Sequence, residues 1–218
     1  MKEARRRNII ALAGFIAFYA CLASAFIVLL KLKLIRLPFH RVSGIIESYS
    51  ALISYMPVFV IALVSMLWLK FLEVRVFNFL KWKRFSLYFI FGLVLSAGYA
   101  FYILVFNKHE YHPVYFIIPV IILSLLNSFS EEMIYRFVFL RLLENSGIGF
   151  HTSNIIQSLF YSFLHIFIGG YRLAILGFIY GLLMGHITKK SESLLPAMIC
   201  HFVIDIGVIG LPMMIARF

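Results

Sequence analysis

Seven long apolar stretches restrict the fold of this chain more than any other feature of its sequence. A helix of about 20 apolar residues spans the hydrocarbon core of a bilayer and bonds all its backbone polar groups internally. Of the 218 residues, 63% are hydrophobic and 13% charged, which excludes an ordinary soluble domain. We predict an all-α fold, one polytopic transmembrane bundle over residues 1–218, with seven helices near 8–30, 50–72, 86–106, 114–143, 153–168, 171–187 and 194–216.

The net charge of +11 arises from lysines and arginines that gather between the apolar stretches. With seven helices, the basic residues of 2–7, 70–84 and 189–190 fall on one side, which the positive-inside rule makes cytoplasmic. The basic residues of 31–41 then face the other side, unless segment 31–49 lies along the surface or re-enters the membrane and the count becomes eight. Short basic segments that are rich in aromatic residues typically lie at the level of the lipid headgroups. We expect the lipid bilayer, and no nucleic acid, as partner, and a multi-pass location in a bacterial plasma membrane.

Two adjacent glutamates, Glu131 and Glu132, interrupt the apolar stretch 114–143. A carboxylate at bilayer depth costs about 2.5–3.5 kcal/mol on insertion scales, so it marks a functional site that faces the protein interior. Neighbouring residues of a helix diverge by about 100°, so the two carboxylates must have different partners. Arg136 lies four residues after Glu132 and can form an ion pair that offsets the burial of both charges. Glu131 has no cation at that spacing, which suits it to accept a proton as a general base.

Two of the later apolar stretches carry a histidine well inside them, His165 and His201, whereas His186 lies at the end of its stretch, beside Lys189 and Lys190. Asp205 follows His201 at helical spacing, where its carboxylate can accept a hydrogen bond from the imidazole and fix its tautomer. At 1.5 Å per residue, Glu131 and His165 lie about 18 Å, and His201 about 11 Å, from the helix ends on one membrane face. We therefore expect these groups to converge in one cavity. The alternative is a set of polar contacts that only stabilise helix packing.

The stretch 171–187 carries Gly177, Gly181 and Gly185 at four-residue spacing on one helix face. Small residues at this spacing allow two transmembrane helices to approach closely. We interpret the three glycines as a packing surface.

Three short motifs in order resemble a known family. EEMIYR (131–136) is similar to EExxxR, YSFLH (161–165) to FxxxH, and HFVID (201–205) to HxxxN/D. Together, on apolar helices, they resemble the CAAX protease and bacteriocin-processing family of intramembrane glutamic endopeptidases, which includes the Ras-converting enzymes. The resemblance covers about 120–210, within a family-like catalytic core of about 114–216.

The resemblance implies a site made of Glu131, His165, His201 and Asp205. Glu131 and His165 would activate a water for attack on a peptide carbonyl, while His201 and Asp205 would support the oxyanion. The implied function is hydrolysis of a peptide bond in a membrane-associated protein or peptide, with no metal and no cofactor.

Glu132 and Arg136 would be the supporting ion pair of this site, in agreement with their spacing. The sequence departs from the family pattern at Tyr161, where Phe is usual, and at Asp205, where the prenyl-protein proteases carry Asn. An ionised aspartate has no proton to donate to an oxyanion. Either Asp205 is protonated, or it orients His201, which then donates. Asp at this position is similar to the bacterial branch of the family.

Other functions fit the same residues. Glutamate, histidine and aspartate are all zinc ligands in metalloproteases, although the chain lacks an HExxH spacing and its two cysteines, Cys21 and Cys200, form no CxxC pair. A membrane immunity or regulatory protein could use the buried groups to bind a partner. A proton-coupled transporter could use them as a relay, but transporters typically show internal repeats, and the two halves of this chain do not. The sequence does not indicate an oligomeric state.

Overall fold

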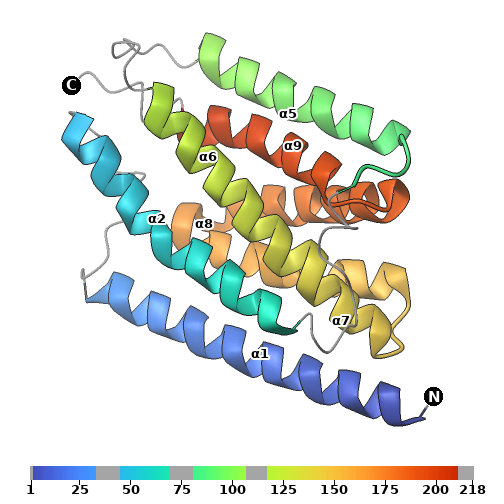
Figure 1. Cartoon of the computed structure of the whole chain (residues 1–218). Coiled ribbons are helices and arrows are strands. Elements are labelled where there is room, and N and C mark those ends of the chain that lie inside the picture. Colours follow the sequence, from blue (N-terminus) through green and yellow to red (C-terminus); the bar gives the residue numbers. More distant parts are fainter. Residues whose placement is uncertain (1, 33–44, 69–80, 107–116, 211–218) are drawn as a thin grey trace.

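The computed structural model describes residues 2–32, 45–68, 81–106 and 117–210, and all regular structure within them is helical (Figure 1). The predicted all-α transmembrane bundle is confirmed. The elements are α1 (Lys2–Lys31), α2 (Ile45–Ser65), the 3-10 turn η1 (Met66–Trp68), α5 (Leu87–Phe106), α6 (Ile117–Glu132), the π-helix η3 (Met133–Phe139), α7 (Leu140–Asn145), α8 (Phe150–Ser191), α9 (Leu195–Asp205) and the π-helix η4 (Ile206–Gly210).

Three helical segments among the described residues are long and apolar enough to cross a membrane: Arg5–Ala25, Ile117–Asn145 and Gly169–Ser191. Shorter apolar helices occupy Met56–Trp68, Leu87–Ile103 and Leu195–Val208. The predicted stretches 50–72 and 194–216 continue beyond the described residues. Most of segment 31–49, on which the choice between seven and eight spans depends, also lies outside them.

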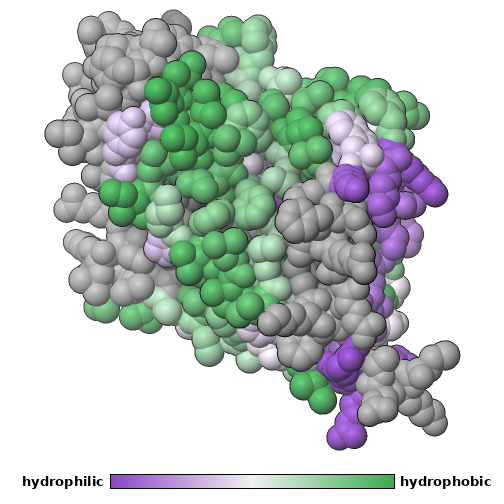
Figure 2. Space-filling model, viewed as in Figure 1, coloured by the Kyte–Doolittle hydropathy of each residue, from purple (hydrophilic) through white to green (hydrophobic). Residues whose placement is uncertain are grey.

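The face of the bundle drawn in Figure 2 is mainly apolar, and hydrophilic residues gather along one edge of it. Large side chains such as Ile53, Leu87 and Phe101 are exposed on the helix faces, as expected where lipid surrounds them. Purple residues gather at the edge beside the N-terminus of α1. The contacts at this end are Arg5 Nε to the Ser146 carbonyl oxygen (3.3 Å), the Arg84 N–H to the Ser191 carbonyl oxygen (3.2 Å) and Lys189 Nζ to Glu144 Oε1 (2.6 Å). The basic residues of 2–7, 81–84 and 189–190 therefore share one end, as predicted, and the rest of the predicted basic segment 70–84 lies outside the described residues.

The rod formed by α6, η3 and α7 lies at the centre of the bundle. α6 packs against α2 on one side and α9 on the other (Figure 1). Buried apolar side chains of η3 and α7, including Phe137, Phe139 and Leu142, form one core cluster with Phe15 of α1. This packing fixes the rod that carries both glutamates.

Helix α8 is a hairpin of two halves, broken at Gly169 and Gly170. Gly170 has φ 73° and ψ −172°, a backbone conformation that is essentially restricted to glycine. The break falls between the predicted helices 153–168 and 171–187, so the two halves run antiparallel against each other.

The predicted glycine surface packs these halves together. A Cβ at Gly185 would lie 1.8 Å from Asn154 Oδ1, and one at Gly181 would lie 3.0 Å from Ser158 Oγ. The interpretation of the glycines as a packing surface is therefore confirmed. The same close approach lets side chains of the first half of α8 reach backbone groups of the second: Asn154 donates to the Leu182 carbonyl oxygen (3.0 Å) and Gln157 to that of Gly181 (3.1 Å).

Candidate active site

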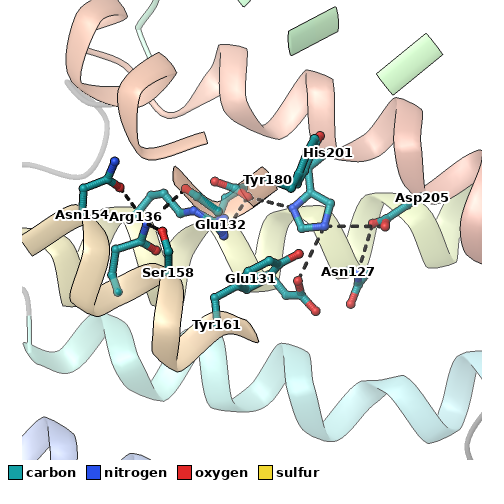
Figure 3. A network of polar contacts seen from close by, with 12 residues as sticks. Asn127, Glu131, Glu132, Arg136, Asn154, Ser158, Tyr161, Tyr180, His201 and Asp205 are labelled. Atoms are coloured by element: carbon teal, nitrogen blue, oxygen red, sulfur yellow. Dashed lines mark hydrogen bonds and ion pairs between the residues drawn. The ribbon is translucent and has the colours of Figure 1, made fainter. Parts of the chain in front are cut away.

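The two adjacent glutamates end α6 and contact opposite nitrogens of one imidazole (Figure 3). Glu132 Oε1 lies 2.7 Å from His201 Nδ1, while Glu131 Oε2 lies 3.5 Å from His201 Nε2. His201 is 2% exposed, on the facing helix α9. The helix geometry that turns neighbouring side chains apart thus places one carboxylate on each side of a buried ring, and the expected convergence of Glu131 and His201 is confirmed.

Glu132 also forms the predicted ion pair with Arg136, with Oε1 and Nη1 3.0 Å apart and both side chains fully buried. The guanidinium carbon lies 4.4 Å from the centre of the Tyr161 ring, a distance suited to a cation–π contact. One carboxylate therefore joins Arg136 to His201. Because both charges are out of water, loss of either partner leaves an uncompensated buried ion.

Asp205 has two contacts. Its Oδ2 accepts a hydrogen bond from Asn127 Nδ2 at 3.0 Å, and its Oδ1 lies 3.5 Å from His201 Nε2. The sequence predicted Asp205 as the carboxylate that fixes the tautomer of His201, but the 2.7 Å contact is that of Glu132. The reason is tertiary: Glu132 faces the ring from another helix, whereas Asp205 lies one turn along the same helix.

His201 Nε2 is surrounded by carboxyl groups. Because the Glu132 carboxylate can only accept, His201 Nδ1 carries a hydrogen, and Nε2 remains for Glu131 and Asp205. A hydrogen bond to either of these needs a proton on Nε2 or on the carboxyl group itself. The arrangement can therefore hold and transfer a proton among three groups.

His165 lies in the first half of α8, in contact with Tyr161. Its Nδ1 is 2.9 Å from the Tyr161 carbonyl oxygen. A carbonyl only accepts, so Nδ1 carries the hydrogen and Nε2 has a free lone pair in the neutral ring. Among the described residues, no hydrogen bond or ion pair joins His165 to Glu131. The structure thus places it beside, and not within, the carboxylate cluster.

A cavity of about 250 Å³ joins His165 to this cluster. Its wall contains His165, His201, Asp205 and Tyr161. The remainder is mainly apolar, formed by side chains such as Leu95, Leu176, Ile179 and Leu183. His165 and His201 therefore face one space, as the depth argument predicted, whereas Glu131 reaches it only through its contact with His201 and is not among the lining residues. The space is large enough for a water and part of a substrate.

Three features of the site escaped the sequence analysis. Asn127, which lies four residues before Glu131 in α6, was not expected to bind Asp205, although a lone amide in an apolar stretch is a usable signal. Nothing in the sequence indicated that the Tyr161 ring packs against the Arg136 guanidinium. A π-helix follows at once after the Glu131–Glu132 pair and another after Asp205, η3 and η4 respectively, and such segments are frequent at functional sites.

No group of three or more histidine, cysteine, aspartate or glutamate side chains among the described residues is arranged to hold a metal ion. The carboxylates already contact donors of the protein: Glu132 contacts His201 and Arg136, and Asp205 contacts Asn127. That the protein needs neither metal nor cofactor stays a prediction, which chelation of the purified protein tests.

Comparison with known protein families finds a match for the second half of the chain. Residues 113–207 match the family described as type II CAAX prenyl endopeptidase Rce1-like. This segment contains all three motifs, so the resemblance drawn from them is confirmed over their length. Neither the curated proteins nor the solved structures gave a match.

Proposed function

We propose that this protein hydrolyses a peptide bond of a membrane-associated protein or peptide, because residues 113–207 match the Rce1-like family of endopeptidases. One observation carries the proposal: Glu131 and Glu132 contact the two nitrogens of the buried His201, beside a cavity that His165 also lines. A general base, a donor for the oxyanion and a group that orients the water can together hydrolyse an amide, and a carboxylate and two imidazoles can supply these roles.

Glu131 is the proposed general base. It removes a proton from a water in the cavity while the free Nε2 of His165 holds that water by accepting its second hydrogen. The water oxygen then forms a bond to the substrate carbonyl carbon, and the carbonyl oxygen becomes an oxyanion. When the carbon–nitrogen bond breaks, Glu131 returns its proton to the leaving amine, so the carboxylate is regenerated.

His201 is the proposed donor to the oxyanion. Nδ1–H of His201 donates to Glu132, so the ring presents a second hydrogen, Nε2–H, to the cavity in its imidazolium form, which the surrounding carboxylates stabilise. Asp205 then acts as a positioning residue that keeps the proton on Nε2, which is the second of the two readings of this aspartate. Glu132 and Arg136 also position the ring and do not touch the substrate.

The proposed substrate presents an apolar group to the cavity. Most of its wall is hydrocarbon or aromatic, and apolar pockets with a few polar groups bind apolar ligands in a fixed orientation. Asp205 stands where the prenyl-protein proteases carry Asn, and this departure argues against a farnesylated substrate. The proposed location is a bacterial plasma membrane, with the basic end of the bundle in the cytoplasm.

Comparison of protein termini in cells tests the function. We would compare cells that carry wild type, Glu131→Ala, His165→Ala or the control Glu192→Ala, which changes an exposed glutamate paired with Arg84. We expect a set of new termini with wild type and Glu192→Ala that both site variants lose. Identical termini in all four strains, at equal protein levels, would favour the non-enzymatic alternatives.

A further inference from the structure

A second cavity, of about 440 Å³, lies at the basic end of the bundle, between the ends of α7 and α8 and the segment before α5. Charged residues line it: Lys83, Arg136, Arg141, Lys189, Glu144 and Glu192. Lys189 is 48% exposed, whereas Arg136 is fully buried. The wall therefore extends from the surface of the protein to the ion pair behind the catalytic cluster.

Two buried polar side chains of this wall lack hydrogen-bond partners. Nε, Nη1 and Nη2 of Arg136 form no hydrogen bond, and Nη1 has only its ion pair with Glu132. Thr188, 3% exposed, has an unpartnered Oγ1. Each buried donor left unsatisfied costs about 1–3 kcal/mol. Donors of this kind, on residues that line a cavity, indicate that an acceptor belongs there.

The charges of the wall select an anion. Four cations outnumber two carboxylates, and Glu192 is already paired with Arg84 (3.2 Å), which is not among the lining residues. Glu144 is paired with Lys189 (2.6 Å). A guanidinium presents its N–H groups in a fork that matches phosphate oxygens, and lysines add point charges around them.

We propose that this cavity binds a phosphate group, supplied by an anionic lipid headgroup or by free phosphate. Basic pockets between transmembrane helices, at the cytoplasmic end of a bundle, are suited to phosphate headgroups. Arg136 belongs to this wall and also to the Glu132–His201 chain of contacts, so the bound anion lies one ion pair from the catalytic cluster. The binding proposal does not depend on the peptidase proposal, and its test needs no cleavage.

The test measures binding by the full chain, purified in a neutral detergent. Thermal stability is titrated with sodium phosphate at constant ionic strength, and separately with mixed micelles of phosphatidylcholine and phosphatidic acid. Lys83→Gln/Lys189→Gln removes two cations of the wall, and the control Lys81→Gln/Lys190→Gln removes their exposed neighbours, which do not line the cavity. We expect the first pair to weaken binding about tenfold or more and the second less than about twofold.

Glu144→Gln tests the proposal in the opposite direction, because it should raise the affinity for the anion. It removes a negative charge from the wall and releases Lys189, so it should tighten binding several-fold. Saturable stabilisation by phosphate itself would identify a free anion as the ligand, and stabilisation by phosphatidic acid alone a lipid headgroup. No saturable binding in either titration, or equal weakening by both lysine pairs, would overturn the proposal.

Discussion

Glu132 is the residue on which most of the site depends. Its single carboxylate contacts both a buried guanidinium and a buried imidazole, at 3.0 Å and 2.7 Å. The neighbouring Glu131 keeps one oxygen without a hydrogen-bond partner, 3.5 Å from the other side of the ring. Adjacent residues of one type thus have different roles, since Glu132 holds both Arg136 and His201 through Oε1, whereas Glu131 is the proposed acceptor of a proton from the substrate water.

Removal of Glu132 should separate stability from activity. Glu132→Leu leaves the buried Arg136 unpaired and should lower the free energy of unfolding by about 3–5 kcal/mol. Glu132→Leu/Arg136→Met removes both charges and should recover most of that stability, yet neither variant should cleave, because His201 has lost its partner. Thermal unfolding in detergent with a parallel cleavage assay measures both. Equal stability of Glu132→Leu and wild type would show that the ion pair has no structural role.

Two substitutions of Asp205 should distinguish a positioning residue from a proton donor. Asp205→Asn keeps an oxygen that accepts from Asn127, whereas Asp205→Ala leaves that amide without its partner. We expect Asp205→Asn to keep cleavage within about tenfold of wild type and Asp205→Ala to lose about 100-fold or more. Equal losses in the two variants would mean that the carboxyl proton itself is required.

The sequence was sufficient to identify these residues but not to assign their contacts. The spacing of Glu132 and Arg136 predicts their ion pair because both lie on one helix. The partner of Glu132 on the other side, His201, is 69 residues away, and no local pattern encodes that contact. The sequence predicted that Asp205 fixes the tautomer of His201, because Asp205 is the carboxylate at helical spacing from it. The shorter contact to the ring is made by Glu132, from another helix.

At the scale of elements, the hairpin of α8 positions His165. Gly170 turns the chain, and the small residues that follow let the second half pack close to the first, so that His165 and Gly177 are neighbours. Apolar length and glycine spacing were enough to predict both halves and their break. The π-helices η3 and η4 were not predicted, because bonding between residues five apart leaves no distinct pattern of residue types.

Substitution at the glycine surface should destabilise the hairpin. A methyl group at Gly185 would overlap Asn154 Oδ1, whereas one at Gly98, in the middle of α5, has no heavy atom within 4 Å. We expect Gly185→Ala to cost about 1–3 kcal/mol and Gly98→Ala to be neutral or slightly stabilising. Thermal unfolding in detergent compares the two. A Gly185→Ala variant as stable as Gly98→Ala would show that the halves of α8 are not in close contact.

At the scale of the molecule, an apolar belt and a basic end define how the bundle lies in a membrane. The basic segments come from the start of α1, the segment before α5 and the end of α8, yet their contacts with α7 and with one another gather them at one end. The sequence predicted this gathering of basic segments because the charge and the hydropathy of a whole segment decide on which side of a membrane it lies. The number of spans depends on residues 31–49, most of which the structure does not describe.

Labelling of introduced cysteines tests this orientation. In a Cys21→Ala background, a cysteine that replaces Lys190 lies at the basic end, and one that replaces Leu32, which is 62% exposed, lies at the far end of α1. Helix α1 has 30 residues and so extends about 45 Å, more than the membrane core. An impermeant maleimide added to intact cells should label only the Leu32 site. Labelling of the Lys190 site instead would invert the proposed topology.

The most direct test of the central claim is cleavage by the purified protein in proteoliposomes, with a substrate found from the comparison of termini. Glu131→Gln preserves the size of the side chain and removes the base. We predict that it folds with the stability of wild type and cleaves about 1,000-fold or more slowly. Cleavage by Glu131→Gln at the rate of wild type would contradict the assignment of Glu131 as the base that activates water.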